Sequence, residues 1–166
     1  MNETLQLTAL VAATITMGLS AGVFLLYAHT IMPGLKTTDD RTFVVAFGAI
    51  DRAIINPVFM VSAFFGALVF TTAAALLQLD EEAFGWIAAA LVLYAALVGI
   101  TVRVHLPRND ALKAAVAEGE PDDPAATRSA FGEATWVRWN WVRVALNLSA
   151  FGLLCWALVV AGDAAG

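Results

Sequence analysis

The chain has 166 residues, of which 60% are hydrophobic and 14% are charged, and its mean hydropathy is +0.78. This balance excludes a disordered chain, a collagen and an ordinary soluble enzyme domain, because soluble domains carry about 25% charged residues. The net charge of −5 argues against nucleic acid as a partner, since nucleic-acid-binding surfaces are basic. The composition predicts an integral membrane protein with the lipid bilayer as its main partner.

Four long stretches contain no Asp, Glu, Lys or Arg: 4–35, 53–79, 83–102 and 144–162. A bilayer core about 30 Å thick needs about 20 helical residues, so each stretch is long enough to cross it once. Backbone polar groups in lipid must be satisfied within the segment, which favours helices. We therefore predict an all-α fold, a four-transmembrane-helix bundle forming a single membrane domain (1–166), with helices at about 5–32, 54–79, 83–104 and 136–162.

The predicted connections differ in length. The first is a loop over 33–53 and the third a loop over 105–135, whereas the turn around Asp80 is very short and makes the second and third helices antiparallel neighbours. In the third connection, Asp123 followed by Pro124 is typical of a helix start, so a helix beginning there could run unbroken into the fourth span.

The basic residues predict the orientation. All nine Lys and Arg lie between the first and second helices or between the third helix and the apolar part of the fourth. Under the positive-inside rule both of these longer loops are cytoplasmic and both termini are extracytoplasmic. We therefore predict an N-out/C-out, multi-pass protein of the cytoplasmic membrane.

Polar residues from four segments converge at the predicted cytoplasmic end of the bundle. Ionisable groups in a membrane are costly, so they tend to face the bundle interior and to mark function. The converging residues include His29, Asp51, Asn56, His105, Asn109, Asn140 and Arg143. All of these except His105, together with Trp136, are the candidate site residues.

Several members of this group have simpler interpretations. Asn56 before Pro57 could serve only as a helix start, His29 could be a satisfied interior histidine, and His105 could sit at the interface. Arg143 is the hardest to explain as a surface charge, because an apolar run follows it directly. Three other arginines could simply extend to lipid headgroups: Arg52, Arg103 and Arg138.

A metal or haem site is a further alternative. His29 and His105 fall at similar predicted depth on different helices, so they could hold a haem, or a metal ion together with a carboxylate. The sequence lacks close ligand spacings such as HxxxH or ExxH, so we predict no metal and no cofactor and keep the histidine pair as the minority alternative.

Several short motifs, taken in order, resemble a known family. The chain is similar over nearly its whole length to the anthrone oxygenase-like family. This family consists of small four-helix integral membrane proteins and is classed as a domain of unknown function, because most members have no known activity. The resemblance rests on residues 22–24, Met32–Leu35, 39–43, 55–59, 106–112, Trp136, Asn140 and Arg143. At the position before 106–112, where that family carries asparagine, this chain has His105.

The resemblance implies an oxidoreductase. Characterised family members oxidise an anthrone to an anthraquinone with molecular oxygen, so we expect a monooxygenase or oxidase acting on a lipophilic aromatic, anthrone- or quinol-like molecule at the cytoplasmic end. Such chemistry needs a base, hydrogen-bond donors for an oxyanion and a dry pocket. We assign His29 as the base and Asp51 as the second choice, with donors from Arg143, Asn140, Asn109 and Asn56, and with Trp136 in substrate binding.

Two non-enzymatic functions stay open from the sequence. The chain could be a non-catalytic scaffold, accessory subunit or lipid-binding protein, or, with four helices and only after oligomerising, a transporter. A homo-oligomer is possible and nothing in the sequence decides it. An inward cavity near His29 and Arg143 would favour the enzyme.

Overall fold

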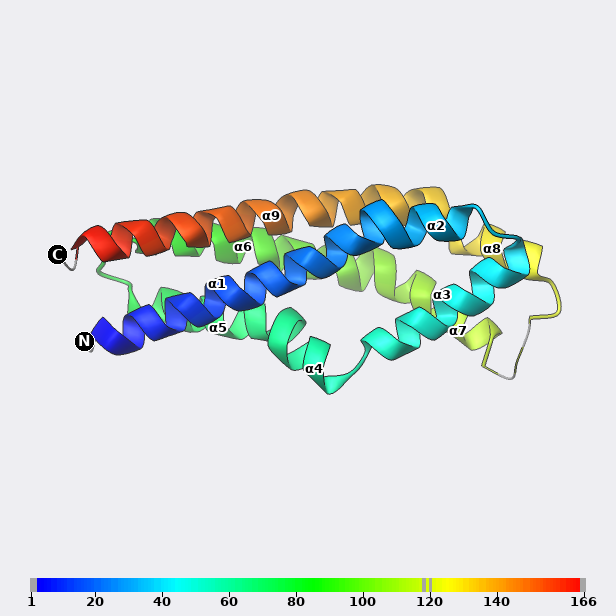
Figure 1. Cartoon of the computed structure of the whole chain (residues 1–166), viewed down its shortest axis with the longest axis horizontal. Helices are drawn as coiled ribbons and strands as arrows, with labels where there is room; N and C mark the ends of the chain where they lie inside the picture. Colours follow the sequence, from blue (N-terminus) through cyan, green and yellow to red (C-terminus); the bar gives the residue numbers. More distant parts are fainter. Residues whose placement is uncertain (1–2, 118, 120, 165–166) are drawn as a thin grey trace.

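The computed structural model of the chain describes residues 3–117, 119 and 121–164, and the regular structure in these residues is helical. Four long apolar helical segments run alongside one another (Figure 1), at Glu3–Lys36, Pro57–Leu77, Phe84–Ala115 and Pro124–Asp163. Each is long and apolar enough to cross a bilayer. The predicted four-helix, all-α fold is confirmed, and the chain is a multi-pass membrane protein.

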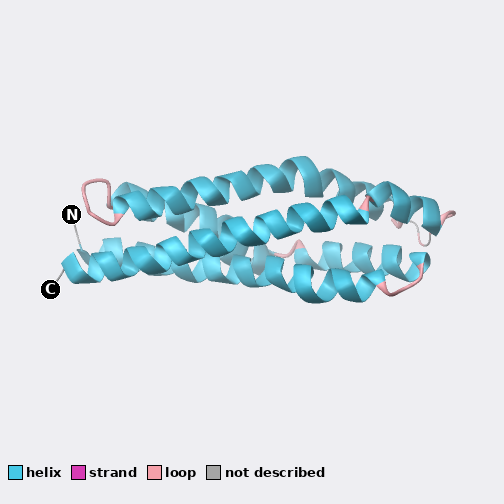
Figure 2. Ribbon diagram, turned by 90° about the horizontal axis from the view of Figure 1, so that it is seen from above, coloured by secondary structure: helices cyan, strands magenta, loops and turns pink. Residues whose placement is uncertain are grey.

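Each span is a series of shorter helices, and three of these helices are π-helical turns, labelled η. Figure 2 shows the loops that join one helical stretch to the next. In chain order the helices are α1 (Glu3–Leu26), η1 (Tyr27–Ile31) and α2 (Met32–Lys36) in the first span; α3 (Asp40–Ile54); α4 (Pro57–Phe59), η2 (Met60–Phe64) and α5 (Phe65–Leu77) in the second; α6 (Phe84–Ile100), η3 (Thr101–His105) and α7 (Leu106–Ala115) in the third; and α8 (Pro124–Phe131) and α9 (Glu133–Ala164) in the fourth.

The connections differ from the predicted loops. Helix α3 fills most of the predicted loop 33–53, and α7 and α8 fill much of the predicted loop 105–135. These helices carry charged residues, so a search for charge-free stretches passes over them. Asp123 does cap α8, but α8 does not continue into α9, because Gly132 takes a left-handed conformation (φ 68°) between them.

Helix α3 begins at a side-chain cap and packs through aromatic residues. The carboxylate of Asp39 accepts hydrogen bonds from the Thr42 backbone N–H (2.9 Å) and hydroxyl (2.7 Å), which hold the pKa of Asp39 below its usual value. One turn apart, Phe43 and Phe47 are buried, and the Phe47 ring lies 4.7 Å from that of Phe131 in α8. Helix α3 is thereby anchored against α8 at one end of the bundle.

The two ends of the molecule differ. Both termini lie at one end, which we call the terminal end, and α3, α7 and α8 lie towards the other, which we call the α3 end (Figure 1). At the terminal end, the Gln6 side-chain amide donates to the Leu77 carbonyl (2.8 Å) and ties the first span to the second. Four crossings place both termini on the same side of the membrane; the extracytoplasmic orientation stays a prediction.

The π-helical turn η2 depends on a glycine at its end. Helix α5 passes close to α1 there, and a Cβ added at Gly66 would collide with the Val61 carbonyl oxygen and lie 3.3 Å from Thr16 Cγ2. Tyr94 fixes the same turn, since its hydroxyl donates to the Phe64 carbonyl (2.8 Å). The absence of a side chain at position 66 therefore lets the second span pack against the first.

We expect Gly66→Ala to destabilise the protein by about 1–3 kcal/mol, because the added methyl forces a backbone shift in a packed region. The measurement is thermal unfolding in detergent. Gly85→Ala is the matched control, since nothing lies within 4 Å of a Cβ at that position, and alanine favours a helix over glycine. Equal melting temperatures for the two variants would show that η2 does not require the glycine.

Candidate functional site

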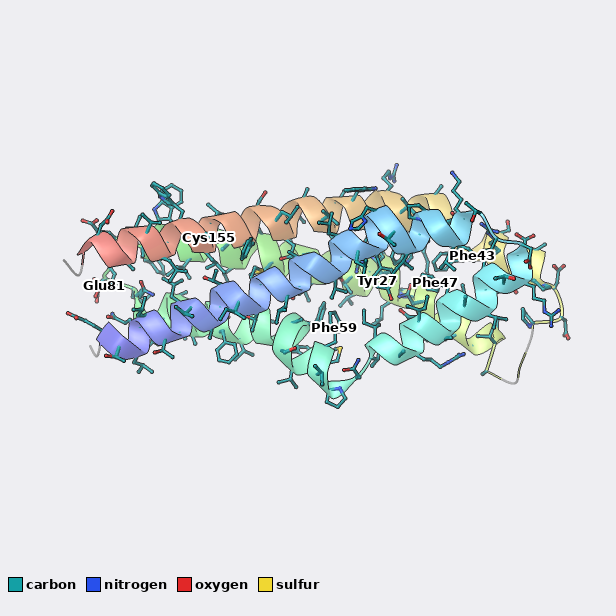
Figure 3. The ribbon with its side chains drawn as sticks, viewed as in Figure 1. Tyr27, Phe43, Phe47, Phe59, Glu81 and Cys155 are labelled. Carbon is teal, nitrogen blue, oxygen red and sulfur yellow. The ribbon has the colours of Figure 1, made fainter. Side chains whose placement is uncertain are left out.

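A cavity of about 250 Å³ lies towards the α3 end and is lined by residues of all four spans and of α3. Its walls are mostly apolar and aromatic, with Phe24, Phe64 and Trp136 among them. Figure 3 shows Tyr27, which also lines it, in the half of the molecule that carries Phe43 and Phe47, far from Glu81 and Cys155. The polar residues that line the cavity are Tyr27, Asp51, Thr101, His105, Asn109 and Arg143.

All three π-helical turns contribute to this cavity. Tyr27 comes from η1, Met60 and Phe64 come from η2, and Thr101 and His105 come from η3. A π-helical turn holds an extra residue, which changes the direction of the side chains that follow, and such turns occur frequently at functional sites. The three spans thus depart from regular α-helix at the level where they surround the cavity.

Arg143 places a buried cation on the cavity wall. The residue is 5% exposed, and its guanidinium donates to the Thr101 hydroxyl (3.2 Å) and to the Asn140 side-chain carbonyl (2.8 Å). The guanidinium carbon lies 4.5 Å from the centroid of the Phe24 ring and 5.5 Å from that of Trp136. Buried charges in membranes are usually paired, yet Arg143 has no ion pair within the described part of the chain.

On residues that line the cavity, four polar atoms are buried without a hydrogen-bond partner in the described residues: Tyr27 Oη, Asp51 Oδ2, His105 Nδ1 and Arg143 Nε. Asp51 Oδ2 has an ion-pair partner, the Lys113 ammonium at 3.0 Å, so the other three atoms are left without a partner there. Leaving such atoms unpaired costs about 1–3 kcal/mol each, more when charged. Because all three belong to the lining of one cavity, they are the groups that a bound ligand would satisfy. An acidic or anionic oxygen has the hydrogen-bonding capacity that such groups require.

His105 has a defined tautomer. Its Nε2 lies 3.3 Å from the Trp136 carbonyl oxygen, which can only accept, so Nε2 carries the proton. In the neutral ring Nδ1 then carries the lone pair. This ring is 1% exposed and packs edge-on against the Trp136 indole at 4.9 Å. The His105 ring is therefore fixed in orientation through Nε2, and its basic nitrogen Nδ1 has no hydrogen-bond partner in the described residues.

Asp51 is held by residues of α7. One carboxylate oxygen accepts from the Asn109 amide (2.6 Å), and the other lies 3.0 Å from the Lys113 ammonium. Asn109 in turn accepts from the Trp136 indole N–H (2.9 Å). Lys113 also pairs with Asp110, at 3.0 Å. Asp51 therefore lines the cavity with its charge compensated by lysine, whereas Arg143 has no ion pair in the described residues.

The structure brings together most of the site residues named from the sequence. Asp51, Asn109, Trp136 and Arg143 line the cavity. Asn140 is completely buried behind it, where its amide donates to the Phe24 carbonyl (3.1 Å) and its oxygen orients Arg143. Asn140 is thus placed to position the guanidinium rather than to contact a ligand.

Two of the named residues lie elsewhere. His29 is exposed, bonds to the neighbouring Thr30 hydroxyl through Nδ1 (2.5 Å) and lines a separate surface groove. Asn56 caps α4 by accepting from the Phe59 backbone N–H (3.0 Å) and does not line the cavity. His29 therefore belongs to the same π-helical turn as Tyr27 but does not line this cavity, and the helix-start interpretation of Asn56 describes its contacts.

The sequence argument did not single out Tyr27 and Thr101, and it assigned His105 only to the interface or to a metal. Tyr27 and Thr101 stand inside charge-free stretches, and uncharged polar side chains are common in such stretches. A tyrosine hydroxyl needs a hydrogen-bond partner when buried, and this was the available signal. The two histidines line different cavities, and the described residues hold no group of three or more His, Cys, Asp or Glu that could bind a metal.

The fold and the cavity are those of a multi-pass membrane protein with a buried arginine on the wall of an aromatic cavity. The anthrone oxygenase family model matches residues 56–153, and the chain belongs to that family. The matched range includes 106–112, Trp136, Asn140 and Arg143 but leaves out the earlier motifs at 22–43. No curated protein and no solved structure matches the chain.

Proposed function

We propose that this protein oxidises a lipophilic aromatic, anthrone- or quinol-like molecule with O2 in the cavity beside Arg143. The observation that carries the proposal is a buried guanidinium, without an ion pair in the described residues, on the wall of an aromatic cavity. A volume of about 250 Å³ is at the small end for ligand sites and suits a flat ring system. Family membership supports the reaction class.

The chemistry matches the residues present. An anthrone has a methylene group between two aromatic rings, and loss of a methylene proton gives an aromatic enolate. Arg143 would stabilise the negative oxygen in a site that excludes water, where electrostatic stabilisation is strong. The electron-rich enolate is itself able to reduce O2, so the proposed reaction needs no resident metal or cofactor.

In the proposed reaction, O2 oxidises the methylene group of the substrate to a ketone. His105 Nδ1 takes one methylene proton, and the enolate transfers an electron to O2 before its carbon bonds to the resulting superoxide. The peroxide recovers the proton from His105 and becomes a hydroperoxide. Removal of the second methylene proton then breaks the O–O bond, which leaves a ketone and releases water. One atom of O2 ends in the ketone and the other in water.

We assign the base to His105 because its Nδ1 is the basic atom with a free lone pair on the cavity wall. Asp51 remains the alternative, although one of its oxygens accepts from Asn109 and the other is in an ion pair with Lys113. Because the resembled family carries asparagine at position 105, this assignment concerns this chain in particular.

The direct test is turnover by the purified full-length protein in vesicles with 1,8-dihydroxyanthrone. We expect one O2 consumed for each ketone formed, at a rate above that of protein-free vesicles. A rate no higher than that of protein-free vesicles, for this substrate and for a quinol, would reject catalysis. Saturable binding without oxidation would instead identify a lipid-binding or accessory protein.

We expect His29→Ala to leave the oxidation rate within about twofold of the original, because the side chain lies outside the cavity. The measurement is the initial rate of anthraquinone formation at saturating substrate. A loss of about 10²-fold or more, the usual effect of removing a general base, would restore the sequence-based assignment of His29.

We expect metal removal to leave activity unchanged, because the enolate supplies the electrons for O2. The protein is dialysed against EDTA, its metal content is measured, and the initial rate is compared with that of the untreated protein. Loss of activity that returns on adding back iron or copper would show that a metal takes part.

We also propose that the protein lies in the cytoplasmic membrane with both termini extracytoplasmic, on the strength of its basic residues. A topology reporter joined to the C-terminus tests this orientation. We expect signal from a reporter active outside the cytoplasm and none from one active inside.

A further inference from the structure

The most exposed residues that line the cavity are apolar. Ile55 is 53% exposed and Leu106 is 43% exposed. Of the polar lining residues, Tyr27, Asp51, His105 and Arg143 are at most 6% exposed, and Thr101 and Asn109 are half-buried. The opening therefore lies between Ile55, just after α3, and Leu106, the first residue of α7, with the cation at the deep end.

Exposed apolar residues of two spans lie near this opening. Val58 and Val61 in the second span are 75% and 68% exposed, and Val102 in the third span is 54% exposed. All three belong to segments long and apolar enough to cross the bilayer, and Leu106 does as well. Exposed valine and leucine on a membrane-spanning segment contact acyl chains rather than water.

A break in the chain forms one edge of the opening. Helix α3 ends at Ile54 and α4 begins at Pro57, so no continuous helix covers the cavity between them. Asn56 satisfies the exposed backbone at this break by accepting from the Phe59 N–H and donating to the Ala53 carbonyl (2.8 Å). Polar backbone groups are thereby kept from facing lipid unpaired, as a break at membrane depth requires.

A passage alongside Asp51 is obstructed by polar contacts. Asp51 lines the cavity, is 6% exposed and is tied to Asn109 and to Lys113. A solute arriving from the aqueous side would have to separate this ion pair, whereas one arriving from lipid passes only apolar side chains. The route from lipid therefore favours apolar solutes over polar ones.

We infer that the ligand enters the cavity from within the bilayer, through a lateral mouth between Ile55 and Leu106. The ligand is then a flat lipophile that partitions into the membrane and carries one ionisable oxygen for Arg143. This inference rests on the cavity of the proposed function, but its test needs no turnover, so the two proposals can fail separately. The reaction that supplies the substrate must release it into the membrane.

The test uses cysteine reactivity in the full-length protein. Cys155 is the chain's single cysteine, so Cys155→Ala gives a thiol-free background. In it, His105→Cys places a thiol at a 1% exposed cavity position, and Val102→Cys places one on the exposed surface of the same π-helical turn. Vesicles are treated with N-pyrenylmaleimide, which dissolves in the bilayer, or with a cationic methanethiosulfonate supplied on both faces.

The mouth is then narrowed. Ile55→Trp is added to each cysteine variant, with Val58→Trp as the matched control, because Val58 is exposed but does not line the cavity. We expect the pyrene reagent to label the thiol at position 105, Ile55→Trp to slow this labelling at least tenfold, and Val58→Trp to leave it unchanged. Labelling at position 102 should respond to neither tryptophan.

Three results would overturn the inference. The first is faster labelling at position 105 by the cationic reagent than by the pyrene reagent, which would indicate an aqueous route. The second is an equal labelling rate with and without Ile55→Trp. The third is no labelling by either reagent while position 102 reacts, which would show that the cavity is closed to the membrane.

Discussion

Replacing Arg143 by glutamine is expected to lower the rate of oxidation by about 10²–10³-fold, the usual effect of removing one donor to a developing oxyanion. The enolate oxygen would lose its cation in a cavity whose other charged group, Asp51, is negative and already paired with Lys113. The rate of Arg143→Lys should lie between the rates of the original protein and of Arg143→Gln, because lysine keeps the charge but not the planar fork of donors. The measurement is the initial rate of ketone formation in vesicles.

Arg138→Gln is the matched control, since Arg138 lies on the same helix α9 but is exposed and outside this cavity. Its activity should match that of the original protein. Arg143→Gln should also shift the melting temperature in detergent by no more than about 4 °C, because a buried charge without an ion pair adds little net stability. A large loss of stability with proportional loss of activity would instead make Arg143 a structural residue.

Replacing His105 by alanine is expected to lower the rate by about 10²–10⁴-fold, the usual contribution of a general base. Adding imidazole should restore part of the activity, because the truncated side chain leaves space on the cavity wall for a small base. Binding of the substrate, measured without O2, should change little. A structural role for His105 would predict neither the separation of binding from turnover nor the rescue by imidazole.

Asp51→Asn is the comparison for this prediction. If Asp51 acts only by lining the cavity and balancing Lys113, the asparagine variant should keep more activity than His105→Ala. If His105→Ala keeps nearly all activity while Asp51→Asn loses about 10²-fold or more, Asp51 is the base. That outcome would leave the oxidation itself intact and move its proton transfer to the carboxylate.

The sequence predicts the spans well because charge is excluded from the bilayer core, and the four charge-free stretches each coincide with an apolar helical segment. It predicts α3 poorly for the same reason. Helix α3 contains four charged residues, so a search for charge-free stretches cannot find it: Asp40, Arg41, Asp51 and Arg52. Its buried residues Phe43 and Phe47 nevertheless have helical spacing. A search for the helical period would have found this helix.

The site is predicted in part, and the π-helical turns explain the rest. An added residue rotates everything that follows by about 100° relative to a regular helix of 3.6 residues per turn. His29 lies inside η1 and His105 ends η3, so the direction of neither side chain follows from regular spacing. Arg143 and Asn140 lie in the uninterrupted helix α9, where the i, i+3 relation brings them together as expected.

The most direct test of the central claim is an anaerobic titration of the protein in vesicles with 1,8-dihydroxyanthrone, followed by its absorption spectrum. The claim is that a buried Arg143 binds the anionic oxygen of a lipophilic aromatic molecule. It predicts that the bound molecule shows the enolate spectrum at a pH where the free molecule is in its keto form, and that Arg143→Gln abolishes this change. A bound keto spectrum in both proteins, or no binding to either, would contradict it.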